Sequence, residues 1–433
     1  MPSDALWDWN PWWNDPTRVQ PLVGRPRDEL ASILPLLTDP KVLVISGVRR
    51  AGKTTIMYQL ISRLMGQGVD ARNILFLGLE DPAFISESLD SLLREYRENQ
   101  NPKGGTYVFL DEVQSKDDWE RVVRKELDLR RDCKFIVSGS SSTLIRGEYA
   151  TLLTGRNLTH IVHPLSFRSY CQFVENEVPR AEGRESAERA RALLKQYLEV
   201  GGFPEVVLQA EEMRRATLNQ YFHDIVHRDI IHMHSADPRK VHAMASYLLM
   251  NVGNPVTLSS LRRALGLSYD AIRDYIQYLE QARLFYFVRE FSFSAKPAPR
   301  EGGKLKVYCT DVGMAQTGLA RHSRDFGRVA ENAVYLDMAR RGLAPGFFRG
   351  KKEIDFVVVE PGRSVLLVNV CMSRRELPER ELEGFREFTA RYPRARCRKV
   401  AITDDIEGET EGVEMVPLWK WLLKDWEKVP KGK

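Results

Sequence analysis

The chain has 433 residues, of which 43% are hydrophobic and 28% charged, and its formal net charge is +5 at pH 7. This length suffices for about three domains, and the hydrophobic content excludes a globally disordered chain. No stretch approaches the ~18 apolar residues of a membrane span, and the tryptophan-rich start lacks the apolar core of a signal peptide. The five cysteines lack C-x-x-C spacing, which argues against a disulfide framework or a zinc site and favours a cytoplasmic location. The mild positive charge permits contact with nucleic acid without arguing for it.

Short apolar runs alternate with segments of helical spacing from residue 41 to about residue 164. The runs rich in β-branched and aromatic residues are predicted strands, at residues 41–46, 73–80, 106–110, 134–138 and 158–162. Continuous apolar strands separated by amphipathic helices are typical of a mostly parallel sheet with helices on both faces. We therefore predict that residues 1–164 form an N-terminal segment and an α/β domain.

A glycine-framed loop lies between the first of these strands and the helix that follows it. Residues 47–54 read GVRRAGKT and match the phosphate-binding pattern G-x-x-x-x-G-K-[ST]. In this arrangement the backbone N–H groups of the loop wrap a polyphosphate, and the positive end of the helix adds to the attraction. Lys53 then reaches the β- and γ-phosphates, and the Thr54 hydroxyl is a ligand of Mg²⁺. The predicted nucleotide-binding residues of this segment are Gly47, Arg49, Arg50, Ala51, Gly52, Lys53, Thr54 and Thr55.

Two acids follow the strand at residues 106–110, at the edge of the sheet where open α/β folds bind their ligands. Asp111 is predicted to hold Mg²⁺, and Glu112 is predicted to orient and deprotonate the attacking water as a general base. An acidic strand end without a role is the alternative, and the nearby phosphate loop favours catalysis. The next strand ends at Ser138, which either lies between these acids and the γ-phosphate or belongs to a plain Gly/Ser turn.

Helical spacing dominates the next part of the chain, and we predict a helical lid at residues 165–238. Residues 239–293 then contain a helix, a turn at Gly266, a longer helix and a β-wing, which is typical of a winged helix. The longer helix carries three acids against one arginine, whereas a helix that enters a DNA groove usually carries positive charge. For this unit we favour protein docking or oligomerisation over sequence-specific DNA binding.

Helices and strands are mixed again in the last part of the chain, residues 294–433. The predicted helices are at residues 325–341 and 376–392, and the predicted strands at residues 353–359, 364–370 and 399–402. The predicted fold class is therefore α/β, with a P-loop NTPase parallel sheet and a helical lid, followed by a winged helix and a further α/β domain.

Several motifs together resemble those of prokaryotic, largely archaeal, AAA-type ATPases with a C-terminal PD-(D/E)xK nuclease-like domain. These motifs are NPWW at residues 10–13, GVRRAGKTT at 47–55, FLDEVQ at 109–114, SGSSSTL at 138–144, LLTGR at 152–156, HPLSF at 163–167 and GGFPEV at 201–206. The resemblance covers essentially the whole chain and extends to signal-transduction ATPases in which the nucleotide state gates an oligomer. It implies ATP as the nucleotide, a homo-oligomer such as a ring, and a nuclease-like fold for the last domain.

The resemblance also implies roles for single residues. Ser138 would occupy the sensor position beside the γ-phosphate, and Arg156 would be an arginine finger that acts on the nucleotide of a neighbouring subunit. A basic residue that only complements a helix dipole is the alternative for Arg156. Pro204 would pack on the adenine, and a proline in the first turn of a helix is an equally good interpretation.

The nuclease pattern is incomplete in this chain. Glu331 and Asp355 match two of the acids with which such nucleases bind a divalent metal. The following strand has Asn369 and Cys371 where the pattern has an acid and a lysine. Asparagine offers a neutral oxygen where hard cations prefer carboxylates, and cysteine provides no positive charge. We therefore expect a nuclease-like domain without nuclease activity.

Taken together, the motifs predict a cytoplasmic, Mg²⁺-dependent ATPase that acts as an oligomeric switch or motor. The expected partners are ATP and ADP, further copies of the chain, and a protein or a nucleic acid, with no membrane. One alternative is a DNA-processing protein, whose ATPase would be stimulated by DNA with a steep salt dependence. Another is a nucleotide-gated scaffold with negligible turnover, in which Glu112→Gln would change little.

Overall fold

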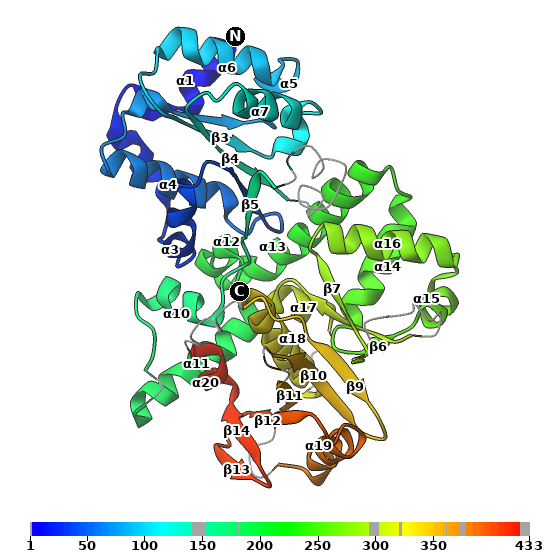
Figure 1. Ribbon diagram of the computed structural model, residues 1–433. Helices are drawn as coiled ribbons and strands as arrows, with labels where there is room; N and C mark the ends of the chain where they lie inside the picture. Colours follow the sequence, from blue (N-terminus) through cyan, green and yellow to red (C-terminus); the bar gives the residue numbers. More distant parts are fainter. Residues whose placement is uncertain are drawn as a thin grey trace. The chain divides into compact units, whose positions relative to one another are not determined.

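The chain forms two compact units in the computed structural model (Figure 1). The first contains Met1–His163 and Gln281–Arg283, and the second contains Pro164–Glu280 and Leu284–Lys433. The structure describes residues 2–140, 153, 155–180, 182–293, 303–319, 323–360, 362, 364–372 and 377–424. Most of the SGSSSTL motif, part of LLTGR and the start of the helix predicted at 376–392 lie outside the described residues.

A five-stranded parallel sheet is the core of the first unit, in the order β2-β3-β4-β1-β5. Its strands are β1 (Val42–Ser46), β2 (Ile74–Gly78), β3 (Thr106–Asp111), β4 (Cys133–Gly139) and β5 (Asn157–Ile161). Every residue of β1 and β2 is buried, as expected for apolar strands covered on both faces. The sequence prediction of these five strands and of their parallel pairing is confirmed.

Helices cover both faces of this sheet (Figure 1). The longest are α4 (Lys53–Gly66), α6 (Leu89–Gln100) and α7 (Trp119–Asp128). From β1 the chain crosses to the edge strand β2, and from there it returns through β3 and β4 in the opposite direction. Because parallel crossovers are right-handed, α4 covers one face of the sheet and α6 and α7 cover the other. Shorter helices surround them, namely α1 (Pro2–Trp9), α2 (Gln20–Val23), α3 (Leu30–Ile33) and α5 (Pro82–Ile85).

The N-terminal segment closes the sheet along its edge strand β2. The Asn10 side chain donates to the Phe76 carbonyl oxygen at 2.9 Å and accepts from the Phe76 N–H at 2.6 Å, as a neighbouring strand would. Trp12 and Trp13 both donate their indole N–H to the Ile74 carbonyl oxygen, at 3.2 and 2.8 Å. These contacts satisfy backbone groups that an edge strand otherwise leaves unpaired. The unusual tryptophan content of the start is explained by this packing.

Helices alone make up the first part of the second unit among the described residues, as the sequence predicts. They are α10 (Phe167–Glu175), α11 (Arg184–Val200), α12 (Pro204–Leu208) and α13 (Glu211–Asp224), followed by a π-helical segment, Ile225–His232. A π-helix of this length is rare. Within the described part of the chain, no helix has both the length and the apolarity that crossing a bilayer requires.

A small three-stranded antiparallel sheet follows, in the order β6-β8-β7. The elements are α14 (Pro238–Met250), β6 (Pro255–Val256), α15 (Leu258–Leu265), α16 (Tyr269–Gln281), β7 (Phe285–Arg289) and β8 (Leu305–Cys309). Gly266 ends α15 in the left-handed conformation, at the predicted turn. Because β8 pairs with β7 along its full length, this sheet extends beyond the boundary predicted at residue 293.

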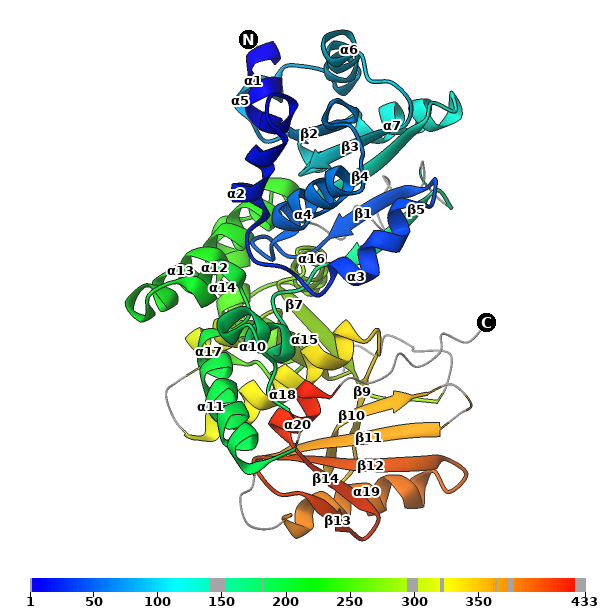
Figure 2. The ribbon, with the colours of Figure 1, turned by 90° about the vertical axis from the view of Figure 1, so that its left-hand side faces the viewer.

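The last part of the second unit is built on a six-stranded mixed sheet, in the order β13-β14-β12-β11-β10-β9 (Figure 2). Its strands are β9 (Gly346–Arg349), β10 (Glu353–Val359), β11 (Ser364–Cys371), β12 (Arg396–Thr403), β13 (Gly408–Thr410) and β14 (Val413–Pro417). The helices are α17 (Val312–Gly318), α18 (Ser323–Arg340), α19 (Glu379–Arg391) and α20 (Leu418–Leu423). Phe385 and Phe388 of α19 pack with Val365 and Leu367 of β11 in one apolar core. The three predicted strands are confirmed, and β9, β13 and β14 were missed.

Candidate functional site

The phosphate loop of the first unit connects β1 to α4 at the carboxyl edge of the parallel sheet. Arg50 and Gly52 have positive φ angles of 69° and 96°, which turn the backbone toward the start of α4 at Lys53. A Cβ on Gly47 would lie 2.2 Å from the Val162 carbonyl oxygen, so only glycine fits where the loop passes the segment after β5. The resulting loop and helix N-terminus form the anion-binding arrangement that the sequence predicts.

Lys53 and Thr54 point from the first turn of α4 to the end of β3. The buried Lys53 ammonium donates to the Gly47 carbonyl oxygen at 3.1 Å and lies 3.4 Å from Glu112 Oε1. The Thr54 hydroxyl donates to Asp111 Oδ2 at 2.6 Å. The structure thus brings the lysine, the hydroxyl and both acids of the predicted site together.

The two acids differ in their environment. Burial and the charge of Glu112 raise the pKa of Asp111. Burial also acts to raise the pKa of Glu112, but the positive charges of Lys53 and Arg49 outweigh it, and the net shift is downward. Glu112 has a left-handed backbone (φ 54°), and its Oε2 accepts a hydrogen bond from Gln114 Nε2 at 2.5 Å. Glu112 is therefore held as a carboxylate at neutral pH.

Ser138 lies at the carboxyl end of β4 and contacts both acids. Its fully buried hydroxyl donates to Asp111 Oδ1, and it accepts the backbone N–H of Glu112 at 3.2 Å. This position fits the interpretation in which Ser138 lies beside the acids and not in a turn without a role.

The oxygen atoms at this edge suit a magnesium ion. The Thr54 hydroxyl and the Asp111 carboxylate already meet at hydrogen-bond distance, so a single cation can contact both. Hydroxyl and carboxylate oxygens are ligands that Mg²⁺ prefers, usually completed by waters and phosphate oxygens. The residues present therefore fit the cofactor.

Arg27 is a further residue of the site that was not predicted. It is 5% exposed, and its guanidinium donates to the Ala51 carbonyl oxygen at 2.9 Å and to the His163 carbonyl oxygen at 3.0 Å. Glu29 neutralises its charge at 2.7 Å. Arg27 therefore connects the phosphate loop to the segment after β5. Its partner in the loop, Ala51, is 24 residues away in the sequence, and its partner after β5, His163, is 136 residues away.

Arg49 and Arg156 differ in their relation to these residues, because the charge of Arg49 acts on Glu112 whereas Arg156 lies elsewhere on the sheet. The Arg49 guanidinium pairs with Glu80 at 3.1 Å. Arg156 directly precedes β5, whose first residue pairs with the first residue of β1, so it lies at the opposite edge of the sheet from the phosphate loop. Its half-exposed guanidinium binds Asp128 at the end of α7. Within one chain the structure does not bring Arg156 to the phosphate site.

Pro204 belongs to the second unit, where it starts α12, as the interpretation of a proline in the first helical turn predicts. The loop before it is tightly packed. The Gly202 N–H donates to Asp311 Oδ2 at 2.6 Å, and a Cβ on Gly202 would lie 2.3 Å from the Leu165 carbonyl oxygen. Burial raises the pKa of Asp311 to about 6.

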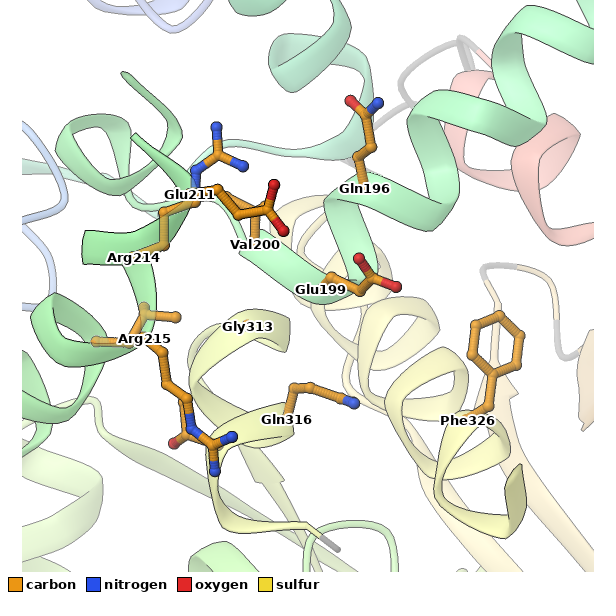
Figure 3. Close-up of a pocket in the computed structure, with 11 residues that line it drawn as sticks. Gln196, Glu199, Val200, Glu211, Arg214, Arg215, Gly313, Gln316 and Phe326 are labelled. Carbon is orange, nitrogen blue, oxygen red and sulfur yellow. The ribbon is translucent and has the colours of Figure 1, made fainter. Parts of the chain in front are cut away.

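The second unit also contains a cavity of about 790 Å³ (Figure 3). Residues of α11, α13, α17 and α18 line it. The wall carries two acids, Glu199 and Glu211, and two arginines, Arg214 and Arg215. None of the predicted site residues is in its wall, and the balanced charges favour no single class of ligand.

Two parts of the chain match known families. Residues 39–171 match the model of a family described as an AAA domain. Residues 191–325 match a second family, described as a domain of unknown function (DUF8612). The second match runs from the helices through the three-stranded sheet and so crosses the boundaries predicted at residues 238 and 293.

The chain is similar over most of its length to two curated proteins, both described as uncharacterized. One, from Methanocaldococcus jannaschii, is 29% identical over 406 residues, which cover 88% of each chain. The other, from Haemophilus influenzae, is 29% identical over 401 residues, which cover 88% of this chain and 94% of that protein. Relatives with a similar length therefore occur in an archaeon and in a bacterium.

Similar solved structures include the Aeropyrum pernix ORC1 protein in complex with DNA and AMPPCP-bound DnaA from Aquifex aeolicus. The first has 12% identity and a TM-score of 0.31, and it covers 69% of this chain and 90% of that one. The second has 16% identity and a TM-score of 0.28, and it covers 58% of this chain and 85% of that one. Scores this low carry no argument about the function of this chain.

The sheet order, the loop after β1 and the acids after β3 define the core of the first unit as an α/β P-loop NTPase fold. With the match over residues 39–171, this part of the chain is more narrowly a domain of the AAA type.

Proposed function

We propose that this protein binds and hydrolyses Mg-ATP and uses the nucleotide cycle as an oligomeric switch or motor on a macromolecular partner. The observation that carries the proposal is the convergence of Lys53, Thr54, Asp111, Glu112 and Ser138 within hydrogen-bonding distance of one another. Four of these residues belong to α4, β3 and β4, and Glu112 directly follows β3. Together they form one polar cluster at the carboxyl edge of the sheet, directly beside the phosphate loop.

Each of these side chains has a distinct role in the proposal. Lys53 and the loop N–H groups bind the β- and γ-phosphates, and Thr54 and Asp111 hold Mg²⁺, which neutralises charge on the phosphates. Glu112 accepts the proton of the attacking water, for which its lowered pKa keeps it ionised. Ser138 fixes Asp111 and the Glu112 backbone and so positions both acids.

Lys53 is engaged by Glu112 and by the loop carbonyl oxygen of Gly47. A triphosphate offers Lys53 a stronger partner, so its binding releases the Glu112 carboxylate toward the water. The Glu112 carboxylate is then free to act on the water only after the triphosphate has engaged Lys53, as a switch requires.

Arg156 is proposed to act in a second subunit, because within its own chain it lies at the far edge of the sheet. Its guanidinium and its partner Asp128 are both about half exposed, and such an ion pair contributes little stability. Arg156 can therefore leave Asp128 and contact the nucleotide of an approaching subunit. Arg156→Ala is expected to abolish turnover and leave ATP affinity nearly unchanged. Mixing it with Lys53→Ala should restore part of the activity, because mixed assemblies contain intact composite sites.

The second unit is proposed to receive the signal. Its order of helix, strand, two helices and two strands around a three-stranded sheet supports a winged helix, and its six-stranded sheet supports the nuclease-like domain. The cellular compartment is proposed to be the cytoplasm.

The direct test is phosphate release from ATP by the purified chain, compared with Lys53→Ala. The proposal expects Mg²⁺-dependent turnover that Lys53→Ala lacks, and fluorescent ATP analogues should bind only the wild type. A chain that neither binds nor hydrolyses ATP would refute the proposal.

A DNA-processing ATPase is the second candidate, supported by the winged-helix order of α14 to β8. Against it, α16 carries Asp270, Asp274 and Glu280 with a single arginine. Stimulation of ATPase by DNA, weakening steeply with salt, would favour this candidate, and equal rates with DNA, RNA and no polymer would exclude it.

A further inference from the structure

The second unit contains a buried lysine surrounded by three carboxylates. Lys306 lies on β8, and its ammonium is 2.8 Å from Glu331 Oε1, 2.6 Å from Glu353 Oε1 and 2.8 Å from Asp355 Oδ1. The lysine side chain is 1% exposed, whereas Glu353 is 34% exposed, so the ammonium lies beneath the acids and not at the surface. The ammonium donates hydrogen bonds to Glu331 and Asp355, and Glu353 is its third ion-pair partner.

The surrounding groups have defined partners as well. Glu331 Oε1 also accepts from the Tyr308 hydroxyl at 2.6 Å, and Asp355 Oδ2 accepts from the Val370 N–H at 2.8 Å. Asn369 Oδ1 accepts from the Asp355 N–H at 3.0 Å, so the neutral oxygen of this residue is used by the backbone.

The charges explain why the lysine stays ionised at this depth. Burial alone would lower the pKa of Lys306, but Asp355, Glu331 and Glu353 outweigh burial and raise it well above its ordinary value. Burial and the charge of Asp355 in turn raise the pKa of Glu331 to about 7. Without a cation at the centre, these carboxylates would repel one another in a poorly solvated place.

A divalent metal does not fit this arrangement. It would need the same carboxylate oxygens at about 2.0–2.6 Å, where the ammonium now lies. The Asn369 oxygen already accepts one hydrogen bond from the backbone, and its Nδ2 donates to Glu381 at 2.8 Å. Among the described residues, no group of three or more His, Cys, Asp or Glu side chains is arranged to hold a metal ion.

We infer that Lys306 is a built-in cation that occupies the centre of the Glu331, Glu353 and Asp355 cluster and takes the structural place of a divalent metal. The inference does not depend on the proposed ATPase activity. Lys306 belongs to the three-stranded sheet, whereas Glu331 is on α18 and Asp355 is in the six-stranded sheet. The ammonium therefore connects these parts of the second unit, and the cluster serves stability where a nuclease would place its metal.

Thermal unfolding of the full chain with Mn²⁺ or with EDTA tests this inference. The Tm of the wild type should be the same in both. Lys306→Met leaves three partly buried carboxylates without their cation and should lower Tm by roughly 10 °C. Mn²⁺ should then recover part of that loss in Lys306→Met. Lys352→Met, which removes a half-exposed lysine paired with Glu383, is the matched control and should change Tm little.

Acetylation of lysines in the native protein, followed by mass spectrometry, gives a second measurement that needs no variant. Lys306 should remain unmodified while Lys352 reacts, because Lys306 is buried and Lys352 is 43% exposed. Equal reaction of the two lysines would overturn the inference. A wild-type Tm that rises with Mn²⁺, with the rise lost in Asp355→Asn, would also overturn it, because the cluster would then bind a metal beside the lysine.

Discussion

Replacing Glu112 by glutamine separates the chemical step from nucleotide binding. The substitution keeps the shape of the side chain and an acceptor for Gln114, but removes the carboxylate that is proposed to act as the base. Loss of a general base lowers a rate by about 10²–10⁴-fold. The Lys53 ammonium, now 3.4 Å from the Glu112 carboxylate, no longer has to leave a charged partner when ATP binds. Because both side chains are nearly inaccessible, the lost attraction exceeds the ~1 kcal/mol of a surface pair, and ATP should bind at least roughly fivefold more tightly.

The hydrolysis rate is measured by phosphate release under saturating ATP, and the affinity is measured by titration of a fluorescent ATP analogue. Glu98→Gln, the same change on an exposed acid of α6, is the control and should leave both values unchanged. If Glu112→Gln turns over ATP at the wild-type rate, another group activates the water and the assigned role of Glu112 is wrong. Weaker ATP binding in this variant would refute the proposed competition between Glu112 and phosphate for Lys53.

Three further predictions concern the loop, the edge of the sheet and a buried acid. Gly47→Ala should abolish binding of the fluorescent analogue because its Cβ would lie 2.2 Å from a backbone carbonyl, whereas Gly66→Ala meets open space and should bind normally. Asn10→Ala should lower the free energy of unfolding by about 2 kcal/mol in urea titrations, since it leaves two backbone groups of β2 unpaired, and an unchanged midpoint would contradict this. Asp311 has a folded pKa of about 6 against roughly 3.9 when unfolded, so its contribution to stability is full below pH ~4 and is lost as the pH rises to about 6. Asp311→Asn should therefore flatten the dependence of Tm on pH in that window, and an unchanged slope would count against the raised pKa.

The core of the first unit could be predicted from the local sequence pattern alone. The strands β1 to β5 are continuous apolar runs, and the phosphate loop has a fixed spacing, so both could be predicted from neighbouring residues. The convergence of Thr54, Asp111 and Ser138 followed from one topological rule, because parallel strands bring their carboxyl ends to the same edge.

Contacts between distant parts of the sequence could not be predicted in this way. Arg27 donates hydrogen bonds to two distant backbone carbonyls, and the residues around it in the sequence do not indicate which carbonyls these are. Lys306 lies in a strand that is short and bordered by a Pro/Gly-rich stretch, and its acids are 25 to 49 residues further on. The missed strands β9 and β13 have four and three residues, too few to show a period, and β14 (VEMVP) lacks the continuous apolar run of the predicted strands.

The closing of the β2 edge by the N-terminal segment also gives the protein an optical probe. The Trp9 ring stacks on Phe76 at 5.7 Å, and Phe76 stacks on Tyr58 at 4.7 Å. Tyr58 belongs to α4, the helix that begins with Lys53. An indole is thereby linked through two aromatic rings to the helix that is proposed to bind phosphate. Because the chain has eight tryptophans, a fluorescence change that is lost in Trp9→Phe would report movements of that helix without any added label.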